Sequence, residues 1–164
     1  MRAAEATKQK SECEMGWARM AFSDVTVVVP VDFSSHSVFA IRSALSIAGD
    51  PKRLHIVHVL MPLDVISPGL LLEAGDDETR AGNARQNMEL LAREQGAEGA
   101  AEIVLLGDPG IQIADYAKKI HADLIVIPSH GYHGLKRLVL GSVAERVIRH
   151  AECSVLVLRR PDAE

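Results

Sequence analysis

Residues 25–34, VTVVVPVDFS, decide the fold that this sequence predicts. The first part of the stretch, 25–31, is a short apolar run rich in β-branched side chains, typical of a strand buried on both faces in a parallel sheet. Asp32 follows at the point where such a strand would end. Similar apolar runs recur at 53–60, 101–106, 123–128 and 154–159, so we expect five strands.

Segments with helical spacing of apolar residues lie between these runs, at 36–49, 76–95, 109–121 and 142–151. Ser142 and Glu145 form a capping-box pattern, which predicts that the hydroxyl of Ser142 caps the last helix. Strands that alternate with helices predict a single-domain α/β fold, in which a five-stranded parallel sheet is sandwiched by helices. Such sheets bind ligands at the carboxyl ends of strands, so the loops after the first and fourth strands are the candidate site.

Composition narrows the class of protein. The chain has 164 residues, a net charge of −4 and 4% aromatic residues, which argues against nucleic acid as a partner. No apolar run approaches the roughly 20 residues of a membrane helix. Cys13 and Cys153 cannot form a disulfide framework, and we expect a reducing, cytoplasmic location.

The start of the chain is treated separately. Residues 1–22 are polar and lack the apolar core of a signal peptide, so we expect a disordered or mis-assigned extension before a domain at 23–162. A short amphipathic element around Trp17 that docks on a partner is the alternative.

Two groups of residues suit nucleotide chemistry, and each has a structural alternative. Asp32, at the end of the first strand, could accept hydrogen bonds from a ribose or base, or could cap the following helix. Gly131, Gly141 and Ser142 could let backbone amides approach a phosphate at a helix start, or could only shape a loop and cap the helix. The common phosphate motifs G-x-x-x-x-G-K-[ST] and G-x-G-x-x-G are absent from the sequence.

Other chemistries fit less well. His130 and His133 have a spacing suited to a metal pair, but no third ligand lies nearby at a recognisable spacing. The G-x-S-x-G elbow of serine hydrolases is missing. Asp32 has no acidic neighbour of the kind that a phospho-receiver needs.

The chain resembles the universal stress protein family. The resemblance rests on PVDFS at 30–34 and on SHGYHGLKRLVLGSVAERVIRHAECSVLVL at 129–158. ATP-binding members carry G-x2-G-x9-G-[S/T], and here Gly131, the nine-residue spacer and Gly141-Ser142 fit that motif. Pro128 replaces the first glycine. Proline has no N–H to offer a phosphate, so it impairs the site if that glycine approaches the ligand and is harmless if it only ends the strand.

The resemblance implies an adenine nucleotide alpha hydrolase-like fold with strand order 3-2-1-4-5. It also implies an ATP site, with Mg²⁺ or Mn²⁺, formed by ten residues: Pro30, Val31, Asp32, Val59, Ile127, Pro128, Gly131, Gly141, Ser142 and Val143. A homodimer through the last strand is expected, because that apolar strand would lie at a sheet edge. We expect an ATP-dependent stress or signalling module with a further, unidentified protein partner. A nucleotide-free dimeric interaction protein and a slow ATPase are the alternatives.

Overall fold

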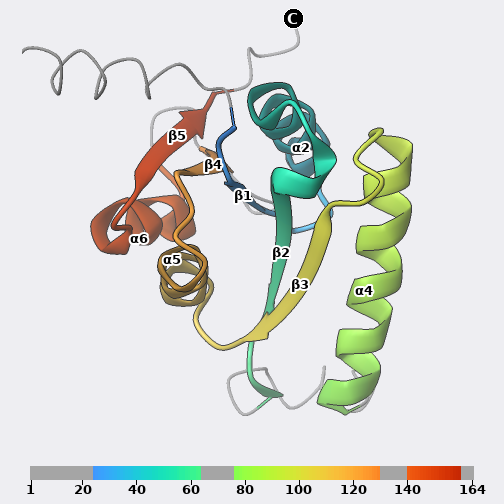
Figure 1. Ribbon diagram of the computed structural model, residues 1–164. Coiled ribbons are helices and arrows are strands. Elements are labelled where there is room, and N and C mark those ends of the chain that lie inside the picture. Colours follow the sequence, from blue (N-terminus) through green and yellow to red (C-terminus); the bar gives the residue numbers. More distant parts are fainter. Residues whose placement is uncertain (1–23, 64–75, 130–139, 160–164) are drawn as a thin grey trace, which may run out of the picture.

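The computed structural model describes residues 24–63, 76–129 and 140–159 (Figure 1). Five strands form one parallel sheet in the order β3-β2-β1-β4-β5, which confirms the expected topology. The strands are β1 (Val27–Pro30), β2 (Leu54–Leu60), β3 (Ala101–Leu106), β4 (Leu124–Pro128) and β5 (Ser154–Leu158). No strand or helix end differs from its predicted position by more than two residues.

Helices cover both faces of the sheet. They are α2 (Ser35–Ala48), α4 (Asp77–Glu94), α5 (Pro109–Lys119) and α6 (Ser142–His150), with a short 3-10 helix η1 (Pro51–Arg53) before β2. In Figure 1, α2 and α4 lie on one side of the sheet and α5 and α6 on the other. None of the helices in the described ranges is both long and apolar enough to cross a bilayer.

The alternation of side chains along β1 explains the continuous apolar run of the sequence. Val27 and Val29 pack into the core on the α2 and α4 side, whereas Val28 packs against α5 and α6. All three side chains are fully buried. A central strand with helices on both faces must be apolar at every position, so periodicity of two is lost.

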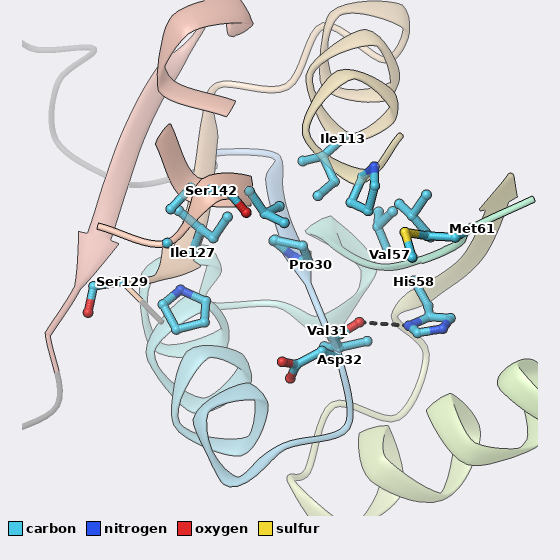
Figure 2. Close-up of a pocket in the computed structure, with 16 residues that line it drawn as sticks. Pro30, Val31, Asp32, Val57, His58, Met61, Ile113, Ile127, Ser129 and Ser142 are labelled. Atoms are coloured by element: carbon cyan, nitrogen blue, oxygen red, sulfur yellow. Dashed lines mark hydrogen bonds between the residues drawn. The ribbon is translucent and has the colours of Figure 1, made fainter. Parts of the chain in front are cut away.

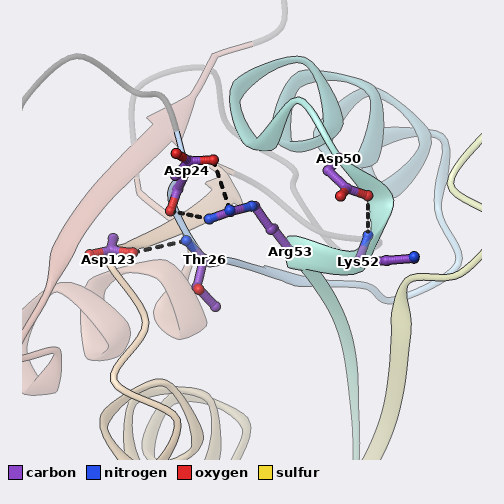
Figure 3. Close-up of polar contacts among 6 residues, drawn as sticks. All are labelled: Asp24, Thr26, Asp50, Lys52, Arg53 and Asp123. Carbon is purple, nitrogen blue, oxygen red and sulfur yellow. Dashed lines mark hydrogen bonds and ion pairs between the residues drawn. The ribbon is translucent and has the colours of Figure 1, made fainter.

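The amino-terminal edge of the sheet is tied by polar contacts, which Figure 3 shows. The Thr26 amide donates to the Asp123 carboxylate at 2.9 Å, which links the starts of β1 and β4. Arg53 pairs with Asp24 at 2.7 Å, which links the starts of β2 and β1. Because these groups are largely exposed, each contact adds little stability. Together they connect the starts of β1, β2 and β4.

The start of α6 differs from the capping-box prediction, which is wrong. Gly141, not Ser142, is the N-cap residue, and no side chain caps the helix. Ser142 is the first helical residue, and Glu145 pairs with Arg149 at 2.8 Å instead of reaching back. The Gly141 amide is bonded to the Ser129 carbonyl at 2.8 Å, which ties the start of the helix to the residue that follows β4.

Candidate functional site

A pocket of about 570 Å³ opens at the carboxyl ends of β1 and β4, where the strand order reverses (Figure 2). Its walls come from the ends of β1, β2 and β4 and from the first turns of α5 and α6. The lining residues are Pro30, Val31, Asp32, Val57, His58, Val59, Met61, Pro109, Ile113, Ile127, Pro128, Ser129, Gly141, Ser142, Val143 and Ala144.

The structure brings nine of the ten predicted site residues together around this pocket. These are Pro30, Val31, Asp32, Val59, Ile127, Pro128, Gly141, Ser142 and Val143. Gly131 lies outside the described residues. The shared cavity is an observation, whereas contact of these residues with a nucleotide stays a prediction.

Asp32 holds a fixed position at the mouth of the pocket. Its Oδ1 accepts hydrogen bonds from the Ser34 amide at 3.0 Å, the Ser34 hydroxyl at 2.6 Å and the Ser37 hydroxyl at 2.7 Å. Ser37 is fully buried, and its hydroxyl oxygen accepts a hydrogen bond from the Asp32 amide at 2.9 Å. Ser34 is the N-cap residue of α2, so the alternative that Asp32 caps this helix is wrong. The network orients the carboxylate before any ligand arrives.

The first turn of α6 forms the opposite wall. The first bond that closes this helix runs from the Glu145 amide to the Gly141 carbonyl at 2.9 Å. The amides of Ser142, Val143 and Ala144 precede that bond and have no partner within the helix. Amides in this position, together with the positive end of the helix dipole, form a favourable environment for an anion.

Close packing of α5 against α6 sets the position of this helix start. A Cβ atom on Gly110 of α5 would lie 2.5 Å from the Cβ of Arg146 in α6, so only glycine fits there without movement. Arg146 also forms an ion pair with Asp108, the N-cap residue of α5. The two helix starts that border the pocket are therefore held against each other.

Pro128 is the last residue of β4 and does not interrupt pairing with β5. The Ser129 amide donates to the Leu158 carbonyl at 2.9 Å, so the backbone of Ser129 faces β5. Neighbouring residues of a parallel strand face opposite sides, so the nitrogen of Pro128 faces away from β5. The proline thus removes an N–H on the side toward the pocket and none from the β4–β5 ladder.

His58 was not identified from the sequence. Its Nδ1 lies 2.8 Å from the Val31 carbonyl oxygen, and its ring centroid lies 4.6 Å from that of Phe33. A carbonyl oxygen cannot donate, so Nδ1 carries the proton. Burial lowers the pKa of His58 and the charge of Arg80 lowers it further, whereas the bond to Val31 and the charge of Asp32 raise it.

Six other lining residues were also missed, namely Val57, Met61, Pro109, Ile113, Ser129 and Ala144. Three of them, Met61, Ser129 and Ala144, immediately neighbour a predicted residue or follow the end of a strand, and the rule that ligands bind at the carboxyl ends of strands could have found these. Val57 lies within β2, two residues before Val59. Pro109 and Ile113 come from α5 and depend on helix packing.

The described residues contain no cluster of three or more His, Cys, Asp or Glu side chains that could hold a metal ion. His130 and His133, considered above as a metal pair, lie outside the described residues.

The sheet order and the pocket at the reversal point define a doubly wound α/β domain of the adenine nucleotide alpha hydrolase-like class. Within this class the sequence identifies the family, because the model of the Universal stress protein family matches residues 26–159. The chain belongs to the universal stress protein family.

Individual relatives agree with this assignment. Universal stress protein MJ0531 of Methanocaldococcus jannaschii is 35% identical over 149 residues, which cover 84% of each chain. The structure of universal stress protein UspA from Lactobacillus plantarum is 28% identical with a TM-score of 0.66, and the match covers 84% of this chain and 99% of that one. A universal stress protein crystallised in complex with cAMP is 26% identical with a TM-score of 0.55, over 82% of this chain and 95% of that one.

Proposed function

We propose that the pocket binds ATP and that the domain acts as a nucleotide-dependent stress or signalling module. The observation that carries the proposal is the pairing of an oriented carboxylate, Asp32, with the open amides of α6 across one cavity. A volume of about 570 Å³ lies within the range of small-ligand sites, roughly 300–1,000 Å³.

The adenine, ribose and phosphates of ATP can each be assigned to a different part of the pocket lining. The apolar residues Val31 and Val59 line the part of the pocket assigned to adenine, and the Asp32 carboxylate suits the ribose hydroxyls as a hydrogen-bond acceptor. The phosphates are assigned to the start of α6, where Gly141, Ser142 and Val143 line the pocket and the amides of Ser142, Val143 and Ala144 have no partner within the helix. Mg²⁺ or Mn²⁺ would accompany the phosphates, since divalent ions usually enter such sites with the nucleotide.

The comparison with a family member in complex with cAMP supports the same ligand class. That ligand shares adenine, ribose and a phosphate with ATP, and the two proteins share this fold.

Calorimetric titration of the purified protein with ATP and Mg²⁺ tests the proposal. We expect saturable binding of one ATP per chain, and mass spectrometry of freshly purified protein to detect retained adenine nucleotide. Tripolyphosphate and adenosine, titrated separately, measure what each half of the pocket contributes.

The alternatives are separate outcomes of the same set of measurements. Absence of binding at millimolar ATP would refute the proposal and favour a nucleotide-free interaction protein. Binding accompanied by steady production of ADP would favour a slow ATPase. Tight binding of cAMP and weak binding of ATP would retain the adenine site but replace the proposed ligand.

A further inference from the structure

The backbone of β2 faces β1 and β3 at alternate residues. The Val31 amide donates to the Val57 carbonyl at 2.8 Å, so Val57 faces β1. The Gly107 amide donates to the Leu60 carbonyl at 2.9 Å, so Leu60 faces β3. Because the direction alternates along a parallel strand, the N–H and C=O of Val59 also point to the β1 side.

β1 ends before it can pair with Val59. The last register pair between the two strands is Pro30 with Val57. In a continued parallel ladder, the residue that donates to Val57 would accept from the amide two residues further on, which is Val59. Instead the Val31 carbonyl is bonded to Nδ1 of His58 at 2.8 Å. A side-chain donor thus stands where a backbone donor would otherwise bind.

We propose that His58 is a positioning residue for the base of the ligand: its Nδ1–H satisfies the Val31 carbonyl and so leaves the N–H and C=O of Val59 open to the pocket. The inference rests on the proposed function, in which Val59 lies beside the base, and concerns how His58 keeps the Val59 backbone available. Val59, Val31 and His58 all line the pocket, and Figure 2 shows the bond between the imidazole and the end of β1.

The surroundings of His58 keep the imidazole in this arrangement. Phe33, which has a left-handed φ of 62°, brings its ring to 4.6 Å from the imidazole. Burial lowers the pKa of His58, so near neutral pH the ring carries one proton, and the carbonyl contact assigns it to Nδ1. Protonation of Nε2 would keep the Nδ1–H bond.

Three substitutions isolate the donor. His58→Phe keeps an aromatic ring and removes the N–H, whereas His58→Asn removes the ring and keeps an N–H donor on the atom bonded to Cγ. His55→Phe is the matched control on the same strand, because Nδ1 of His55 bonds the Tyr116 hydroxyl at 2.8 Å and His55 does not line the pocket.

Hydrogen exchange of the Val59 amide, measured by NMR without any ligand, is the first test. We expect fast exchange in the wild type, His58→Asn and His55→Phe. In His58→Phe the amide can turn to the vacated Val31 carbonyl, and we expect exchange to slow by about tenfold or more, as for a newly formed backbone bond. Strong protection of Val59 in the wild type would overturn the inference.

ATP titration of the same four proteins is the second test. His58→Phe should weaken ATP binding about tenfold, because the Val59 amide then bonds the Val31 carbonyl and one hydrogen bond to the ligand is lost. His58→Asn keeps the donor, and its affinity for ATP should stay within about threefold of the wild type. Equal losses in both His58 variants would overturn the inference, because the donor would then not matter. The expected exchange pattern without ATP binding by the wild type would support control of the Val59 amide by His58 and refute ATP as the ligand.

Discussion

Replacement of Gly141 by aspartate tests whether phosphates bind at the start of α6. Gly141 is the N-cap residue, with φ −63° and ψ 146°, an extended conformation that any residue adopts. Aspartate and asparagine are both better N-cap residues than glycine, by a few tenths of a kcal/mol. Both variants should therefore fold, with helix content and thermal stability equal to or slightly above those of the wild type.

The two variants should differ in affinity for ATP. A phosphate bonded to the Ser142–Ala144 amides would lie within roughly 4 Å of a carboxylate at Gly141, where two like charges repel by about 4 kcal/mol at an effective dielectric of 20. Movement of the side chain and screening by salt reduce this energy. We expect Gly141→Asp to lose at least ~100-fold in affinity, about 2.7 kcal/mol. Gly141→Asn carries no charge and should lose no more than ~10-fold.

Isothermal titration at fixed Mg²⁺, repeated at low and high salt, provides the measurement. The gap between the aspartate and asparagine variants should narrow at high salt, because the repulsion is electrostatic. Equal losses in both variants would indicate a steric effect. Wild-type affinity in Gly141→Asp would refute the placement of phosphates at α6.

Four further predictions follow from the described contacts. Gly110→Ala forces α5 and α6 apart at Arg146 and should cost about 1–3 kcal/mol in urea unfolding, and an unchanged midpoint would contradict that packing. Because burial lowers the pKa of His58 in the folded chain, the unfolded chain binds this proton more readily; stability should therefore fall as pH drops below the ordinary value of 6.5. His58→Phe should flatten that dependence, and an equally steep decline in this variant would assign it to other groups. Val157→Lys in the edge strand β5 should convert the expected homodimer to a monomer by light scattering, whereas a monomeric wild type would rule out that interface. Pro128→Gly should tighten ATP binding if the missing N–H impairs the site, and unchanged affinity would show that Pro128 only ends β4.

The fold was predictable because its signals are local. The apolar run around Val28 and the left-handed Gly49 at the end of α2 each identify an element without knowledge of the rest of the chain. The strand order, in contrast, came from the family resemblance, since periodicity says nothing about which strands are neighbours.

The site was predictable only in part. Nine predicted residues meet at one pocket because parallel strands end at the same edge of the sheet. His58 was missed because its bond to Val31 spans 27 residues and depends on where β1 stops. The capping box failed at Ser142 because Gly141 is the N-cap residue, and the bond that ties the Gly141 amide to the Ser129 carbonyl is a tertiary contact that a local pattern does not contain.

That bond also has a consequence for protein engineering. The Ser129 carbonyl and the Gly141 amide meet at 2.8 Å, so the chain leaves β4 and enters α6 at almost the same point. Because Ser129 and Gly141 are adjacent in space, an inserted segment of any length can join them. Each doubling of its length costs only about 0.6 kcal/mol in closure entropy. The connection between Ser129 and Gly141 is therefore a suitable place to exchange sequences, in order to give the pocket a new ligand or a reporter group without rebuilding the sheet.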